Sequence, residues 1–168
     1  MGQIDKVFFE NPTQDFHVRG IARMLKIPKT TVSYQLKRLL KEGLIVKEGK
    51  AVFSSFRANE SSEIYRFRKT QEFLREFVFS GILDYIEKES RPRCIILFGS
   101  FAKGEYESKS DIDLFVQSQE VAADMGRFER KFGHSINILF EADANKLSAE
   151  LFNNIVNGIK LRGFLKVK

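Results

Sequence analysis

The sequence predicts an α+β protein with two small domains joined by a helix. At 168 residues the chain is too short for one large enzyme core but long enough for two small domains. Hydrophobic residues make up 43% and charged residues 30%, as in globular chains. Helical patterns and a hairpin pattern come first, and a mixture of strands and helices follows. We therefore predict a helical domain at 1–60, a connector helix at 61–78 and a small mixed-sheet domain at 79–168.

Composition excludes several classes of protein. No apolar run approaches the roughly 20 residues that cross a bilayer, and the N-terminus lacks an apolar signal core. We therefore expect a cytoplasmic protein with no membrane partner. Cys94 is the only cysteine, and the two histidines, His17 and His134, stand far apart. This composition excludes disulfide scaffolds and zinc fingers.

The net charge of +6 is concentrated in the first third of the chain. Residues 1–58 hold 11 Lys and Arg against 5 Asp and Glu, whereas residues 59–168 hold 17 of each. Residues 19–41 contain seven cations and no carboxylate. A segment of this kind suits a polyanionic partner.

Three helices and a hairpin are predicted in this basic part. After a short amphipathic start, a helix begins near Val18, and the proline at position 28 separates it from a third helix that ends at Gly43. The third helix has an apolar face at spacings of i, i+4, i+7 and i+8, formed by Val32, Leu36, Leu39 and Leu40. Two β-prone runs in 44–56 flank a Glu48-Gly49-Lys50 tip, which is typical of a hairpin.

The order of helix, turn, basic helix and hairpin resembles the winged helix-turn-helix domain of prokaryotic transcriptional regulators. That resemblance implies binding to double-stranded DNA, with the second helix of the motif in the major groove. The alternatives are a solvated basic face or a winged helix that contacts proteins. The lack of any acid in 19–41 argues against a solvated face, since such helices usually carry both signs. On the DNA interpretation, Lys37, Arg38 and Lys41 neutralise phosphates and Thr31, Ser33 and Tyr34 reach base edges; the full predicted set adds Lys29, Thr30 and Lys50.

A long helical pattern follows at 61–88, and Gly81 is predicted to divide it. One apolar stripe runs along this pattern, and aromatic residues widen it beyond a single face. The stripe comprises Ile64, Phe67, Gln71, Leu74, Val78, Ile82 and Tyr85, and the additional aromatic residues are Tyr65, Phe73, Phe77 and Phe79. Two faces therefore require burial, one on its own domain and one on a second copy of the chain or on the neighbouring domain. We expect a homodimer, because most helix-turn-helix operators have two-fold symmetry.

The segment Cys94–Gln117 carries the sharpest chemical signal. A buried strand, Ile95–Phe98, runs directly into Gly99 and Ser100, where free backbone N–H groups and a hydroxyl can converge on a phosphate. Ten residues later, Asp111 and Asp113 alternate with apolar residues on a second strand, so both carboxylates project to one face. Paired carboxylates suit Mg²⁺, which prefers oxygen ligands. The alternative is a turn and an edge strand that bind no ligand.

A strand, Gly-Ser, ten residues and Asp-x-Asp together resemble the signature of the DNA polymerase β-type nucleotidyltransferase superfamily, especially its minimal members. The resemblance implies that Gly99 and Ser100 hold the phosphates of an NTP, most simply ATP. It also implies that Asp111 and Asp113 are catalytic and ligate Mg²⁺. Lys103 stands where the family often has an arginine, and Ser110 precedes the first aspartate as is usual there; both belong to the predicted nucleotide site.

The third carboxylate of that family usually lies in the middle of a later strand, which matches His134–Glu141 here. The matching position holds Asn137, which has no charge and cannot accept a proton as a general base. Glu141 lies four residues further on, about 13 Å along an extended strand. The sequence is therefore compatible both with a domain that transfers a nucleotide and with one that binds it without turnover.

Three functions are compatible with these features. The first is a DNA-binding regulator with a domain that binds Mg–NTP and can transfer a nucleoside monophosphate. The second is an antitoxin-type nucleotidyltransferase, since the minimal members include enzymes that adenylylate a helical toxin partner of the HEPN family. The third is a catalytically inactive scaffold, which Asn137 and the surplus aromatic surface favour.

Overall fold

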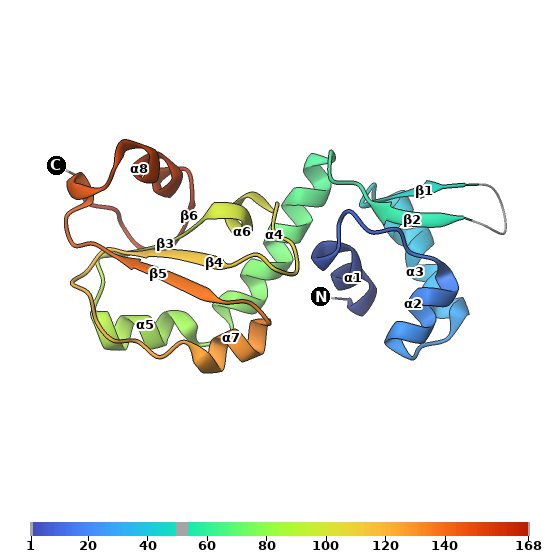
Figure 1. Cartoon of the computed structure of the whole chain (residues 1–168), viewed down its shortest axis with the longest axis horizontal. Helices are drawn as coiled ribbons and strands as arrows, with labels where there is room; N and C mark the ends of the chain where they lie inside the picture. The colour runs from blue at the N-terminus through green and yellow to red at the C-terminus, as the bar shows by residue number, and fades with distance from the viewer. Residues whose placement is uncertain (1, 50–53, 168) are drawn as a thin grey trace. The chain divides into compact units, whose positions relative to one another are not determined.

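The computed structural model describes residues 2–49 and 54–167 and divides the chain into two compact units, Met1–Lys69 and Thr70–Lys168 (Figure 1). The division falls inside helix α4 (Glu63–Val78), whose first part belongs to the first unit and whose second part belongs to the second. Among the described residues, no helix combines the length and the apolar composition that crossing a bilayer requires.

The first unit is a three-helix domain with a hairpin. Its elements are α1 (Gln3–Glu10), α2 (Val18–Leu25), α3 (Lys29–Lys41), β1 (Ile45–Glu48) and β2 (Ser55–Ala58). Val32, Leu36 and Leu39 on α3 are buried as the periodicity predicts, while Leu40 packs partly buried against the same core. The strands β1 and β2 pair in antiparallel register, with Ile45 opposite Ala58. The predicted order of helices and hairpin is confirmed.

The buried side of α4 differs from the predicted stripe. Ile64 and Phe67 of the stripe are 60% and 63% exposed, whereas the additional aromatic residues Tyr65, Phe73 and Phe77 are buried. The buried Tyr65 hydroxyl also donates a hydrogen bond of 2.9 Å to the carbonyl of Phe8, which ties the start of α4 to α1.

Gly81 separates α4 from α5 (Ile82–Ser90), as predicted, and its φ of +85° is the left-handed region that favours glycine. Beyond it the second unit consists of β3 (Cys94–Phe98), α6 (Gly99–Lys103), β4 (Ile112–Val116), α7 (Gly126–Phe132), β5 (Ile136–Phe140), a short 3₁₀ helix η2 (Ala144–Lys146), α8 (Ala149–Val156) and β6 (Ile159–Gly163). The strand order is β5-β4-β3-β6. β3 is antiparallel to both neighbours and β4 is parallel to β5, so the sheet is mixed, as predicted.

Different helices pack on the two faces of this sheet. Helices α5 and α7 lie on one side and α8 lies on the other (Figure 1). On the first side, Leu97 and Leu114 join the aromatic core of α4 and α7. On the second side, Ile96 and Phe115 pack with Ile155 of α8. Because side chains alternate along a strand, Asp113 in β4 projects to the same side as Phe115.

Candidate functional site

Two carboxylates and one amide meet on the α8 side of the sheet. Asp113 lies in β4, Asp111 lies immediately before that strand, and Asn137 stands opposite Asp113 in the parallel register of β5. Asn137 Nδ2 donates to Asp113 Oδ1 at 3.2 Å and to Asp111 Oδ2 at 3.4 Å. The alternation along β4 and its pairing with β5 are therefore sufficient to bring the three side chains together.

The glycine bend at the end of β3 faces the same carboxylates. Phe98 pairs with Asp113, and the next residue, Gly99, begins α6 with a φ of +70°. A Cβ atom at Gly99 would overlap Asp113 Oδ2 and lie 3.4 Å from Asp113 Cγ. Glycine is thus needed here for two reasons, the left-handed backbone and the close approach of the carboxylate. Ser100 follows in the first turn of α6, beside this gap.

The electrostatics of the pair favour a bound cation. Burial raises the pKa of Asp113, the hydrogen bond from Asn137 opposes that rise, and the negative charge of Asp111 adds to it. Asp113 is half-buried and Asp111 beside it is exposed. Their negative charges repel each other, and a hard divalent ion bound by the carboxylate oxygens would relieve that repulsion. Within residues 2–49 and 54–167, no three His, Cys, Asp or Glu side chains gather into a metal site. The third polar side chain beside Asp111 and Asp113 is the amide of Asn137, which donates to both.

Asn137 occupies the position that matches the third carboxylate of the nucleotidyltransferase superfamily. Its amide nitrogen lies between the two carboxylates and supplies hydrogen bonds in place of negative charge. Glu141, the other acidic candidate, follows the last residue of β5, and its Oε1 accepts a hydrogen bond of 2.9 Å from the backbone N–H of Asp143. Glu141 therefore stabilises the turn after β5.

Ser110 lies in the loop that joins α6 to β4, whereas Lys103 is the last residue of α6. Ser110 Oγ accepts a hydrogen bond of 2.9 Å from the N–H of Glu107, so its side chain closes a local turn. Lys103 is exposed in the last turn of α6. His134 belongs to none of the predicted sites, yet its Nδ1 donates to the carbonyl of Ser110 at 2.7 Å and so anchors the residue before Asp111. Only its place before the β5 strand pattern marks it in the sequence.

The predicted DNA-contacting residues occupy two sides of α3. Thr30, Tyr34, Lys37 and Lys41 are exposed at spacings of i, i+4, i+7 and i+11, which is one face of a helix. Tyr34 is 70% exposed. Lys29 and Thr31 are also exposed, Ser33 is half-buried, and Lys50 lies outside the described residues.

Arg38 lies on a different side of α3 and is bound within the first unit. Its guanidinium donates to the buried carboxylate of Asp5 at 2.6 Å and to Glu42 at 3.2 Å. The neighbouring Gln35 accepts a further hydrogen bond of 2.9 Å from its Nε. Arg38 is thus paired with a buried carboxylate on α1, distant in sequence, while its side chain stays 31% exposed; its contact with a DNA phosphate stays a prediction.

Comparison with protein families gives one match in each unit. The model of the MarR family matches residues 10–51, which include α2 and α3, and the model described as polymerase beta, nucleotidyltransferase matches residues 80–160. The first unit thus resembles the MarR family, and the second unit resembles the polymerase β-type nucleotidyltransferases. The nucleotidyltransferase match spans Gly99, Asp111, Asp113 and Asn137, so the entire carboxylate site lies within it.

A solved structure to which part of this chain is similar is described as the crystal structure of a toxin–antitoxin with AMP-PNP. It is 19% identical, covers 51% of this chain and 73% of its own, and has a TM-score of 0.40. None of the curated proteins compared with the chain matches it.

Proposed function

We propose that the protein is a DNA-binding transcriptional regulator whose nucleotidyltransferase domain binds an NTP, with ATP as the first candidate, together with Mg²⁺. The observation that carries the proposal is the close approach of Asp113 to the Gly99 bend, which places a carboxylate against the turn that begins α6. Asp111 and Asp113 would hold the metal, and the backbone at Gly99 with the Ser100 hydroxyl would face the terminal phosphates. The metal would neutralise phosphate charge there.

Ligand binding at this site is tested by thermal unfolding of the full chain with Mg–ATP. A ligand that binds only the folded state adds about 2.7 kcal/mol at one hundred times its Kd, so a clear rise in Tm is expected. Asp113→Asn should remove that rise, whereas Glu89→Gln, an exposed change on α5, should keep it. No rise in the native chain, or the same rise in Asp113→Asn, would refute nucleotide binding at this site.

Asn137 favours binding over rapid transfer. Its amide can accept no proton from an attacking hydroxyl, and the site carries two carboxylates where three are typical of the family resemblance. We expect Asn137→Asp to lower the Tm of the metal-free chain, because it adds a third negative charge, and to enlarge the shift produced by Mg²⁺. An unchanged response to Mg²⁺ would show that position 137 lies outside the metal site.

A transferase function is the second candidate, because the Gly-Ser bend and both aspartates are retained. Its substrate would be a hydroxyl on a helical toxin partner of the HEPN family, which would be adenylylated. Incubation of the full chain, Mg²⁺ and ATP labelled at the α-phosphate with such a partner should label the partner, and Asp111→Ala should abolish the label. If neither the native chain nor Asn137→Asp labels the partner, the transferase function is refuted and a regulator that only binds nucleotide is supported.

The basic face of α3 is proposed to enter the major groove. Lys37 and Lys41 would neutralise phosphates, and Thr30 with Tyr34 would approach base edges. Affinity for a random-sequence duplex should fall steeply between 50 and 200 mM salt, since phosphate contacts release counterions. Lys37→Ala with Lys41→Ala should weaken binding and reduce the salt slope, whereas Lys6→Ala on α1 should change neither. An affinity for DNA that does not change with salt concentration would contradict DNA binding by this face.

A homodimer completes the proposal. Ile64 and Phe67 lie three residues apart on α4 and leave an apolar patch exposed in the first unit. A second copy that covers this patch would present two recognition helices to a two-fold operator. Light scattering of the full chain should give a dimer that Phe67→Ser weakens. A monomer at micromolar concentration would contradict this part of the proposal.

A further inference from the structure

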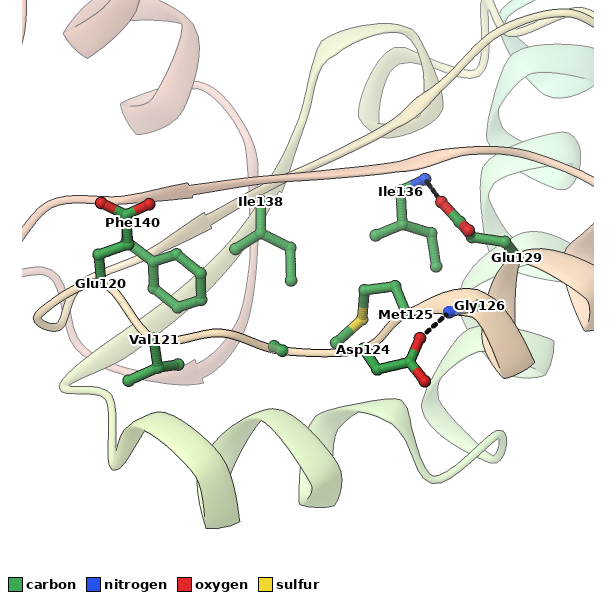
Figure 2. A pocket seen from close by; sticks show the side chains of 10 residues that line it. Glu120, Val121, Asp124, Met125, Gly126, Glu129, Ile136, Ile138 and Phe140 are labelled. Atoms are coloured by element: carbon green, nitrogen blue, oxygen red, sulfur yellow. Dashed lines mark hydrogen bonds between the residues drawn. The ribbon is translucent and has the colours of Figure 1, made fainter.

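A cavity of about 400 Å³ lies beside strand β5, on the side of the sheet that carries α5 and α7 (Figure 2). The side chains of Ile136, Ile138 and Phe140 point into it from β5, and the segment Glu120–Gly126 forms its other wall. Asp113 and Asn137 project to the other side of the sheet, so this cavity is separate from the nucleotide site.

The outer edge of β5 leaves backbone groups open directly above this cavity. The sheet ends at β5, and Ile112 N–H bonds to Ser135 while Glu141 N–H bonds to Val116. In a parallel ladder alternate residues bond to the same neighbour, so Asn137 and Leu139 also bond to β4. The N–H and C=O groups of Ile138 and Phe140 therefore point away from the sheet.

A hydrogen bond from Ile136 supports the conclusion that alternate backbone groups of β5 point away from the sheet. Its N–H donates to Glu129 Oε1 of α7 at 3.0 Å, so this backbone group already has a partner outside the sheet. Among the described residues, β4 is the one strand that pairs with β5, so the other edge of β5 has no strand beside it. The edge from Ile138 to Phe140 has the geometry that accepts one more strand.

The cavity combines apolar side chains with an acidic rim. Ala123 and Met125 pack in the same core as Ile136, Ile138 and Phe140. Its described lining residues include Glu120, Asp124 and Glu129 and no lysine or arginine. Glu129 and Asp124 already accept backbone hydrogen bonds, from Ile136 and Gly126. Glu120 is exposed at the rim, where it can pair with a cation on an incoming chain.

We propose that the β5 edge binds an extended segment of a partner protein, with apolar side chains at alternate positions and a lysine or arginine near Glu120. The segment adds a strand beside Ile138 and Phe140, its alternate apolar side chains enter the cavity, and its cation meets the acidic rim. This surface is independent of nucleotide and of DNA, because it shares no residue with either proposed site.

The probe is a library of seven-residue peptides displayed on phage and selected on the full chain. Selected sequences should alternate apolar residues and include a lysine or arginine. Synthetic versions should lose about tenfold or more in affinity when the amides that face β5 are N-methylated, because two backbone hydrogen bonds are lost. Glu120→Lys should weaken binding further, and Asp113→Asn should leave it unchanged.

Ile138→Pro provides the matched change in the protein, since its N–H points outward and the ladder with β4 stays intact. It should abolish peptide binding while the Tm response to Mg–ATP is retained. The proposal is overturned if no peptide is selected, or if selected peptides bind equally after N-methylation. It is also overturned if the chain pairs with a second copy through β5, seen as a dimer by light scattering that Ile138→Pro abolishes.

Discussion

Gly99→Ala tests the close approach on which the nucleotide site depends. An alanine at a φ of +70° costs about 1–2 kcal/mol of left-handed strain, of which about 0.4–1 kcal/mol is offset by the reduced entropy of the unfolded chain. The new Cβ would also overlap Asp113 Oδ2, and overpacking of this kind costs about 1–3 kcal/mol more. The total loss is therefore about 1–5 kcal/mol, with a midpoint of about 3 kcal/mol.

Gly133→Ala is the matched control for that prediction. Its φ is +76°, yet a Cβ there meets nothing within 4 Å, so only the backbone strain remains. We expect a loss of about 1 kcal/mol, or about 4–8 °C in Tm, against at least twice that shift for Gly99→Ala. Thermal unfolding of the two full-length variants measures the difference, and Gly99→Ala should also lose the response to Mg–ATP. Equal shifts in Tm would refute the close contact between the bend and the carboxylate.

Three further changes test other parts of the structure. Arg38→Met should destabilise the first unit by about 2 kcal/mol in chemical denaturation, since it leaves the buried Asp5 carboxylate without its cation, while Lys37→Met on the exposed face should change stability by less than about 0.5 kcal/mol. Tyr65→Phe should cost about 1–2 kcal/mol, because the buried carbonyl of Phe8 loses its donor, and a variant as stable as the native chain would contradict that bond. Asp113→Asn should raise the Tm of the metal-free chain at neutral pH. Because the pKa of Asp113 is raised in the folded state, folding favours its neutral form, so the advantage of asparagine should shrink as pH falls toward the ordinary range of an aspartate; a constant difference across pH would contradict the assignment.

Short-range patterns were sufficient to predict much of the fold. The spacing of Val32, Leu36 and Leu39 identifies the buried face of α3, and the alternation in 111–116 puts both aspartates on one face of β4. These inferences succeed because helix and strand geometry fixes which residues share a face within a few positions. The Gly-Ser bend and Asp-x-Asp were likewise recognisable, since each depends on residues adjacent in sequence.

Side-chain partners that come from distant parts of the chain were decided by the tertiary structure. The sequence of α3 does not show that Arg38 pairs with Asp5 on α1. Ile64 and Tyr65 are neighbours in the same helical pattern, yet Ile64 is exposed and Tyr65 is buried. The bridging role of the Asn137 amide likewise requires β5 to pair in register with β4. Sequence periodicity thus determined which residues share a face, and only long-range packing decided which face was buried and which charge met which partner, because burial depends on a surface that another segment supplies.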